Sequence, residues 1–125
     1  MKNTQTRIVG YFSKQIINIL ELDIPEGTAI YLGQTNIEHM KSRHPYEFDK
    51  YYYDIETILQ VPDYVGFDKK NNSVDFVKEY AIQDEYIQIS VRVSTNGVFY
   101  ARTMFSIMTY KFERYIRQGT LKPVP

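Results

Sequence analysis

The chain of 125 residues contains no cysteine, which excludes disulfide bonds, thiolate metal sites and a cysteine nucleophile. Nowhere do ~18 apolar residues follow one another, so we expect no membrane-spanning helix and no membrane partner. The six glycines are scattered singly and no Gly-x-Ser-x-Gly turn occurs, which excludes phosphate-loop, dinucleotide-binding and serine-hydrolase motifs. Because no targeting signal is present, a cytoplasmic location is the default expectation.

The chain also lacks net charge, because 15 basic side chains balance 15 acidic ones. The balance changes along the chain: residues 1–45 carry +1, residues 46–85 carry −6 and residues 86–125 carry +5. A polyanion would be drawn to the last third, although a solvated basic helix on a dipolar protein would have the same composition. The basic residues concerned are Arg92, Arg102, Lys111, Arg114, Arg117 and Lys122.

What the chain does contain is enough apolar material for one core, since 43% of its residues are hydrophobic. Domains cluster around ~100 to 150 residues, so we expect a single domain over residues 1–125. Within it, residues 1–27 are expected to form a helical extension and residues 28–122 the main body. The 12 tyrosines combine large rings with polar tips, a composition suited to a binding surface.

Apolar residues recur at helical spacing in four segments, and capping signals mark their ends. Ser13 can accept hydrogen bonds from the first turn of one helix, and Thr35 with Glu38 forms a capping box for the next. Pro45 disfavours helical geometry at His44, so we expect a break there. The predicted helices are residues 13–22, 35–43, 46–59 and 108–118, and Gly119 is the expected C-terminal cap of the last one.

From residue 64 onward the apolar pattern changes to a period of two, which is typical of strands. The predicted strands are residues 64–68, 73–80, 85–94 and a segment that begins at Phe99, and residues 28–32 are predicted as a short strand or extended segment. Lys69-Lys70-Asn71-Asn72 is predicted as the hairpin turn between the first two of the long strands. A three-residue loop at Thr95-Asn96-Gly97 would place Arg102 beside Arg92 on a polar face and turn Thr103 to the core, unless a bulge intervenes. The sequence therefore predicts an α+β fold, in which N-terminal helices pack on a four-stranded antiparallel β-sheet and a C-terminal helix follows.

The two histidines, His39 and His44, lie close to one helix end. Either could act as a general base or acid, because the ordinary pKa of histidine is ~6.5, although one could equally cap a helix or hydrogen-bond in a partly buried layer. Their spacing leaves the rings ~140° apart on a regular helix, and no third ligand at helical spacing joins them. We therefore expect no metal site.

The polar face of the predicted sheet carries Gln88, Ser90, Arg92, Tyr100 and Arg102. Guanidinium groups can neutralise a pentavalent phosphate while a histidine moves the proton of a ribose hydroxyl. Alternation always leaves one such face, so an ordinary solvent-facing sheet surface would show the same pattern.

Several short motifs contain these residues. They are His39-Met40-Lys41-x-Arg43-His44-Pro45 after a strand, Pro62-Asp63 at a helix end, Phe76-Val77-Lys78, and Ala101-Arg102-Thr103-Met104-Phe105 before the last helix. Across residues 28–122, this arrangement resembles the phage-type nuclease domains of the barnase, EndoU, colicin E5/D and RelE-like superfamily.

The resemblance implies helices on a four-stranded antiparallel sheet, and a metal-independent ribonuclease from a prophage, conjugative element or toxin system that needs no cofactor. It also implies site residues. The helical histidine corresponds to His39 or His44, the strand lysine to Lys78, and the basic and hydroxyl groups of the later motif to Arg102 and Thr103.

The leading hypothesis is thus a small endoribonuclease, or a toxin-like relative, that leaves a 2′,3′-cyclic phosphate. A histidine would take the 2′-hydroxyl proton, while Lys78, Arg92 and Arg102 hold the phosphate and Tyr100 contacts the RNA, which could be a tRNA. An antitoxin, an immunity protein or a host protein could be a partner. The alternative is an inactive nuclease fold that inhibits or recruits a host protein through its tyrosine-rich surface.

Between the two histidines, we favour His44 as the base. Lys41 and Arg43 are close in sequence, and neighbouring cations favour the neutral form of an imidazole. His39 could be held against the sheet by its helix, which suits a structural role or a preorganised catalytic one.

Overall fold

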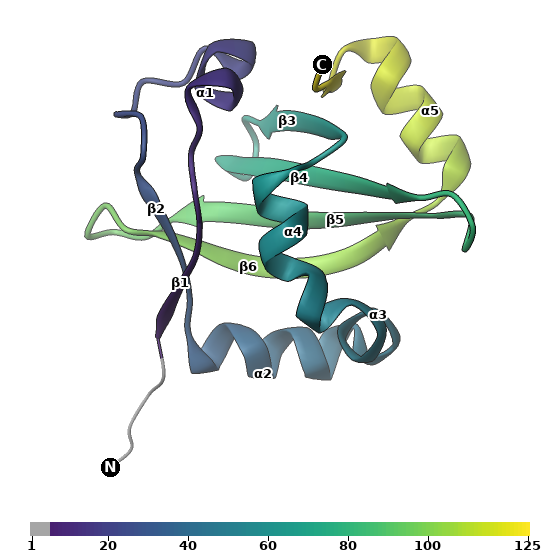
Figure 1. Ribbon diagram of the computed structural model, residues 1–125, viewed down its shortest axis with the longest axis horizontal. Helices are drawn as coiled ribbons and strands as arrows, with labels where there is room; N and C mark the ends of the chain where they lie inside the picture. The colour runs from purple at the N-terminus through teal and green to yellow at the C-terminus, as the bar shows by residue number, and fades with distance from the viewer. Residues whose placement is uncertain (1–5) are drawn as a thin grey trace.

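The computed structural model describes residues 6–125, which form one β-sheet with helices on both faces and along one edge (Figure 1). The strands are β1 (Arg7–Tyr11), β2 (Ala29–Leu32), β3 (Tyr64–Asp68), β4 (Ser73–Tyr80), β5 (Glu85–Val93), β6 (Phe99–Ile107) and β7 (Leu121–Pro123). The helices are α1 (Lys14–Leu20), α2 (Gln34–Arg43), α3 (Pro45–Tyr51), α4 (Ile55–Gln60) and α5 (Thr109–Gln118), with the short 3-10 helix η1 (Tyr52–Asp54) between α3 and α4.

The sheet has seven strands in the order β1-β2-β6-β5-β4-β3-β7. Neighbouring strands are antiparallel except β2 and β6, which pair in parallel at Ile30 with Phe99 and Tyr31 with Tyr100. The predicted fold of N-terminal helices on a four-stranded antiparallel sheet is therefore wrong. The predicted meander is present as β3-β4-β5-β6, but three short strands extend the sheet, and a strand rather than a helix comes first.

Two of these short strands, β1 and β7, were not predicted, whereas β2 corresponds to the short strand or extended segment predicted at residues 28–32. Each of the three has five residues or fewer, and β1 pairs with β2, β2 with β6 and β7 with β3, so these pairings lie outside any local sequence window. Because β1 spans Arg7–Tyr11, the predicted helical extension of residues 1–27 contributes a strand to the sheet as well as α1. Its residues 1–5 lie outside the described part of the chain.

Local capping sets where the first two helices begin. Ser13 accepts a hydrogen bond from the amide of Ile16 at 3.2 Å, so α1 begins as predicted. α2 begins before the predicted capping box at Thr35: Gly33 precedes its first turn and donates its N–H to Oδ1 of Asn36 at 2.9 Å. Asn36, the third residue of α2, thus accepts the hydrogen bond from the N-cap amide that was expected of Glu38 in a box at Thr35.

Residues in left-handed backbone conformation close the turns and helix ends that the sequence marked. Asn72 (φ 52°) lies in the β3–β4 turn, Gly97 (φ 82°) in the β5–β6 loop and Gly119 (φ 75°) at the end of α5. The amide of Ser94 donates to the carbonyl of Val98 at 2.8 Å, which leaves three residues in the β5–β6 loop. The predicted three-residue loop is confirmed.

The main core lies on the face of the sheet that carries α4, which crosses β4 and β5 in Figure 1. Phe76 on β4, Ile89 on β5 and Met104 on β6 are fully buried there, together with Ile58 from α4. Burying one such side chain stabilises a fold by ~1.5–3 kcal/mol. Among residues 6–125, no helix is long and apolar enough to span a membrane.

The opposite face of the sheet is covered only at one end, by α5. Phe112 of α5 is buried against Val77, Ile107 and Leu121, and its ring stacks on Tyr86 with centroids 3.8 Å apart. Val77, Tyr86 and Ile107 lie toward the ends of β4, β5 and β6 nearest α5, and Leu121 belongs to β7. The rest of this face is polar, and the candidate site lies there.

Candidate active site

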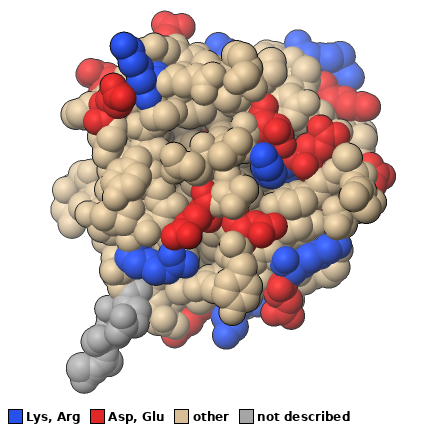
Figure 2. All heavy atoms as spheres, in the orientation of Figure 1, with Lys and Arg blue, Asp and Glu red and all other residues tan. Residues whose placement is uncertain are grey.

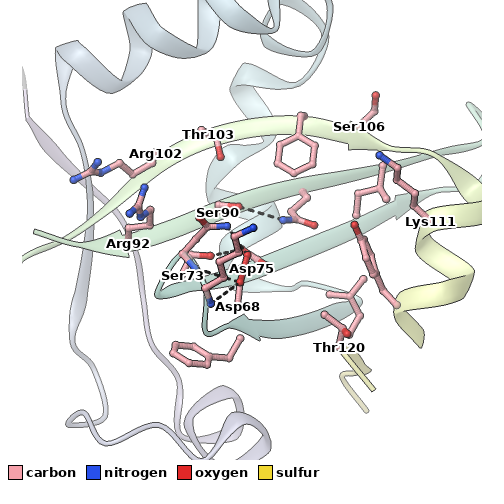
Figure 3. Close-up of a pocket in the computed structure, with 18 of the residues that line it drawn as sticks. Asp68, Ser73, Asp75, Ser90, Arg92, Arg102, Thr103, Ser106, Lys111 and Thr120 are labelled. Carbon is pink, nitrogen blue, oxygen red and sulfur yellow. Dashed lines mark hydrogen bonds between the residues drawn. The ribbon is translucent and has the colours of Figure 1, made fainter. Parts of the chain in front are cut away.

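The uncovered part of this face forms a cleft of about 1100 Å³. Its floor consists of β4, β5 and β6, and its walls are α2, the β3–β4 turn and the α5–β7 segment (Figure 3). The polar floor residues are Ser73, Asp75, Gln88, Ser90, Arg92, Arg102 and Thr103. The polar wall residues include His39, Asp68, Lys69, Lys70, Lys111 and Thr120.

Strand register arranges the floor residues in rows across the sheet. Asp75 on β4 pairs with Ser90 on β5, and Ser90 pairs with Thr103 on β6. In the adjacent row, Ser73 pairs with Arg92. Directly paired side chains lie ~4.5–5.5 Å apart on one face of a sheet. A carboxyl, several hydroxyls and a guanidinium are therefore within reach of one small group in the cleft.

A bulge in β6 brings two predicted site residues into this cleft together. Thr103 pairs with Ser90 whereas Ala101 pairs with Val91, so Arg102 is the extra residue in β6. Regular alternation would have turned Thr103 to the core, as predicted for an unbulged strand. Because of the bulge, Arg102 and Thr103 both line the cleft.

The cleft has an excess of positive charge. Its lining contains Lys69, Lys70, Arg92, Arg102 and Lys111 against the carboxylates of Asp68 and Asp75. Within residues 6–125, none of these five cations lies within ion-pair distance of an acidic side chain. Arg92 and Arg102 lie at the same end of the cleft and Lys111 at the other (Figure 3). Cations without acidic partners favour binding of an anion.

The α4 face of the molecule has no comparable concentration of charge. Figure 2 shows acidic and basic side chains interspersed over that face. Two of its cations are paired, Arg7 with Glu56 at 3.1 Å and Lys78 with Asp63 at 3.7 Å. The zero net charge of the chain therefore hides a cleft that is cationic on one face of the sheet.

Asp75 is the buried carboxyl of the cleft floor. It is 8% exposed and accepts a hydrogen bond from Ser73 Oγ at 3.1 Å. Burial raises the pKa of Asp75 from its ordinary value of 3.8 to about 6, against the opposing effect of hydrogen bonds from Ser90 and Ser73. Gln88 in turn donates to Ser90 Oγ at 3.2 Å. These four side chains form one polar network beneath the cleft.

His39 lies on the wall formed by α2, which runs alongside β6 (Figure 1). The neighbouring Met40 is fully buried in the core and anchors α2, whereas the side chain of His39 is exposed at the cleft. We expected that α2 could hold His39 against the sheet. In the structure its imidazole is instead exposed.

His44 lies just outside the cleft, at the break between α2 and α3. It is half-buried, and its ring centroid is 5.8 Å from that of Phe105, which lines the cleft. Glu47, one turn further on, accepts hydrogen bonds from the amide and hydroxyl of Ser106, both at 3.0 Å. These contacts join α3 to the end of β6 and give His44 a packed position. Its assignment as the base stays a prediction.

Two further predicted residues are not brought to the cleft. Lys78 alternates to the α4 face of β4, where its Nζ donates to the carbonyl of Val61 at 2.7 Å. Tyr100 pairs with Arg92, but its ring packs beside Tyr31 with centroids 6.2 Å apart. Neither residue lines the cleft.

The sequence patterns missed Asp75 and the lysines of the cleft walls. Asp75 interrupts an apolar run in β4 and looks like an ordinary polar strand residue, although its parity places it opposite Ser90. Lys69 and Lys70 were interpreted only as turn residues. Strand parity across the β4–β5 hairpin was the signal that could have found Asp75.

The described residues offer no obvious metal-binding cluster. Among residues 6–125, no three histidine, aspartate or glutamate side chains are grouped closely enough to hold one ion. The cleft groups include guanidinium, ammonium, imidazole and hydroxyl groups with the carboxyls of Asp68 and Asp75. Such groups can bind a phosphate and transfer protons around it.

The comparisons with known proteins identify the family. A family model described as phage-Barnase-EndoU-ColicinE5/D-RelE like nuclease3 matches residues 7–114. The chain belongs to this family. Comparisons with curated proteins and with solved structures found no match.

Membership in the phage-Barnase-EndoU-ColicinE5/D-RelE like nuclease3 family confirms the resemblance drawn from the motifs. The match begins at β1 and ends within α5, so it contains the whole cleft floor and the α2 wall. β1 and α1, which the motif resemblance left out, belong to the matched unit. The chain is accordingly a nuclease of the phage type.

Proposed function

We propose that the protein is an endoribonuclease that cleaves RNA by attack of a ribose 2′-hydroxyl on the adjacent phosphate, without a resident metal. The observation that carries this proposal is the convergence of His39, Arg92 and Arg102 on one cleft. Membership in a nuclease family supports hydrolysis or transfer at phosphate. A scattered, outward arrangement of these three residues would instead have favoured a binding protein.

Arg92 and Arg102 supply the phosphate-binding end of the cleft. A guanidinium donates two parallel hydrogen bonds to phosphate oxygens, and two of them can neutralise the extra negative charge of a pentavalent transition state. Thr103 lines the same cleft because of the bulge in β6, so its hydroxyl can donate to another phosphate oxygen. This arrangement supports catalysis by charge stabilisation at one phosphate.

His39 supplies a proton-transfer group at the same phosphate. It is exposed on the α2 wall, where a substrate can reach it. In this proposal the imidazolium of His39 protonates the leaving 5′-oxygen. Its position in the cleft favours His39 over His44 for this role, because His44 lies outside the lining and packs on Phe105.

Aromatic rings in the cleft favour an unpaired RNA strand as substrate. Phe67, Phe105 and Tyr115 line the cleft and are each half-buried, which leaves part of each ring accessible. Unpaired bases stack on such rings, whereas a duplex hides its base faces. Single-stranded loops or ends are therefore the expected targets.

Cleavage of a mixed-sequence RNA oligonucleotide by the purified protein tests this proposal. We expect cleavage that persists in EDTA, gives 2′,3′-cyclic phosphate ends, and stops at any position carrying a 2′-deoxyribose. The double variant Arg92→Ala/Arg102→Ala should lose ~10²-fold or more in kcat/KM. The charge-matched control is Arg117→Ala/Lys122→Ala, which removes two exposed cations outside the cleft and should cleave at the wild-type rate.

Three outcomes would contradict the proposal. Loss of cleavage in EDTA would refute the metal-independent mechanism, and cleavage of the fully deoxy oligonucleotide would refute 2′-hydroxyl attack. Absence of cleavage of any RNA, together with unchanged bacterial growth and intact RNA on induced expression, would favour a binding protein with a nuclease fold.

A further inference from the structure

Asp75 is the one acidic side chain that is buried among residues 6–125, and it lies on the floor of the cleft. No basic side chain in that part of the chain forms an ion pair with it. A buried carboxyl without a cationic partner destabilises a fold. An asparagine could accept the same hydrogen bond from Ser73 Oγ without carrying a charge. Its ability to take up a proton is what distinguishes an aspartate at this position.

The position of Asp75 relative to His39 suits a reaction at a phosphate between them. Asp75 is on β4, His39 is on α2 beyond β6, and β5 with β6 lies between the two. β4 and β6 are two strand spacings, or ~10 Å, apart, and α2 lies beyond β6, so the space between Asp75 and His39 is wider than this and has room for a substrate phosphate above Ser90 and Thr103. In-line displacement needs its proton acceptor and its proton donor on opposite sides of phosphorus.

We propose that Asp75 is a catalytic residue of this cleft: its carboxylate accepts the proton of the attacking ribose 2′-hydroxyl, while His39 serves as the proton donor on the other side. This inference rests on the proposed ribonuclease function and adds the identity of the base to it.

The proposed step is a balanced transesterification. The 2′-oxygen loses its proton to Asp75 and forms a bond to phosphorus, and the bond from phosphorus to the 5′-oxygen of the next nucleotide breaks. The leaving 5′-oxygen takes a proton from His39, so the products are a 2′,3′-cyclic phosphate and a 5′-hydroxyl. Arg92 and Arg102 compensate the charge on the non-bridging oxygens. Exchange with solvent returns both protein groups to their starting states.

The surroundings of Asp75 support a base that works near neutral pH. Its raised pKa of about 6 leaves it ionised at pH 7 yet a stronger base than an exposed aspartate. Charged and titratable groups face the same cleft from every wall and from the floor. They are His39 from α2, Asp68, Lys69 and Lys70 from the β3–β4 turn, Arg92 from β5, Arg102 from β6, and Lys111 and Tyr115 from α5.

The test compares wild type and Asp75→Asn in single-turnover cleavage of one RNA substrate between pH 4.5 and 8.5. We expect Asp75→Asn to lose ~10²–10⁴-fold in rate with substrate affinity within about threefold of wild type, since general bases contribute on this scale. The acidic limb of the wild-type pH–rate profile, with a midpoint near the Asp75 pKa, should disappear in the variant. Thermal unfolding checks that the variant is folded.

Two further variants sharpen the test. Glu79→Gln removes an exposed carboxyl four residues further along β4, outside the cleft lining, and should leave rate and profile unchanged. Ser90→Ala removes a hydrogen bond that lowers the pKa of Asp75, so the acidic limb should move to higher pH. A merely structural role for Asp75 would not move that limb.

The inference and the proposed function fail in different ways. If wild type cleaves RNA but Asp75→Asn keeps more than a third of the rate with the same acidic limb, Asp75 is not the base and the ribonuclease proposal stands. An unmoved limb in Ser90→Ala would count equally against Asp75. If wild type cleaves no RNA, the proposed function is wrong and this inference falls with it.

Discussion

The two faces of the central strands differ in what they contribute, although they are built from alternate residues of the same segments. On β4, Phe76 faces the α4 core while Asp75 faces the cleft, and on β5 Ile89 alternates with Ser90 in the same way. The α4 face is apolar in its centre, and the charged Lys78 lies on it only toward the end of β4. The cleft face is apolar only where α5 covers it.

This difference shows how a small domain separates stability from chemistry. The core residues of the α4 face are completely buried, so they supply hydrophobic stabilisation and tolerate little change. The cleft face keeps polar groups that stabilise little, and one of them, Asp75, is a buried carboxyl that opposes folding when ionised. Substitutions on the two faces should therefore affect different measurements.

The largest effect on stability is expected from a substitution on the core side of β6, and the next residue, on the cleft side, provides the comparison. Met104 is fully buried in the main core, whereas Thr103 is half-buried in the cleft. We expect Met104→Ala to lower the free energy of unfolding by ~2–5 kcal/mol and Thr103→Ala by less than ~1 kcal/mol. Urea unfolding of the two variants measures this. Equal losses would mean that the bulge does not separate the two faces.

A smaller effect is expected from the charge of Asp75. Its pKa is about 6 in the folded protein against 3.8 for an ordinary aspartate, so the folded state binds this proton more tightly than the unfolded state. The contribution of Asp75 to stability is therefore full below pH 4 and is lost as pH rises through 6. A shift of this size corresponds to roughly 3 kcal/mol.

Asp75→Asn should remove that dependence. We expect the difference in unfolding free energy between variant and wild type to increase in favour of the variant by about 2–3 kcal/mol from pH 4 to pH 8. Urea unfolding at several pH values measures it, and taking the difference cancels groups common to both proteins. A difference that is constant with pH would show that Asp75 titrates alike in the folded and unfolded chains.

The wall of the cleft formed by the α5–β7 segment depends on the small size of Gly66. A Cβ at this position would lie 2.2 Å from the backbone oxygen of Thr120 and 3.1 Å from a methyl carbon of Leu121. Gly66→Ala should therefore push β7 away from β3 and cost ~1–3 kcal/mol, the usual range for overpacking. Amide hydrogen exchange should show faster exchange in residues 120–124 and little change in β5. Unchanged protection of β7 would contradict the close approach.

The sequence predicted the features of this fold that depend on local chemistry. Ser13 caps α1, Pro45 separates α2 from α3, and Gly97 and Gly119 adopt left-handed conformation, because each depends on only a few neighbouring residues. The pairing of β1, β2 and β7 depends on partners distant in the chain, and β1 and β7 have too few residues for alternation to indicate a strand.

The candidate site was predictable to the extent that it follows strand parity. Alternation correctly predicted that Arg92 and Ser90 lie on one face. The face of Thr103 depends on a bulge in β6, and no residue type in that strand indicates where a bulge occurs. Asp75 was missed because its burial and its raised pKa arise from packing around the strand, which composition does not show. Lys78 was assigned to the site by the motif resemblance, but strand alternation places it on the α4 face of the sheet.

The smallest effect on stability, and the sharpest test of the site, comes from the two histidines. His39 is exposed on the cleft wall, so His39→Ala should change the free energy of unfolding by less than ~0.5 kcal/mol while reducing RNA cleavage by ~10²-fold or more. His44 is half-buried against Phe105, so His44→Ala should cost ~0.5–1.5 kcal/mol, the scale of one aromatic contact, with cleavage reduced less than in His39→Ala. Urea unfolding and single-turnover cleavage of both variants decide between them. An inactive, fully stable His44→Ala protein beside an active His39→Ala protein would restore His44 as the proton-transfer residue, and would place the reacting phosphate at the α2–α3 break rather than above Ser90 and Thr103.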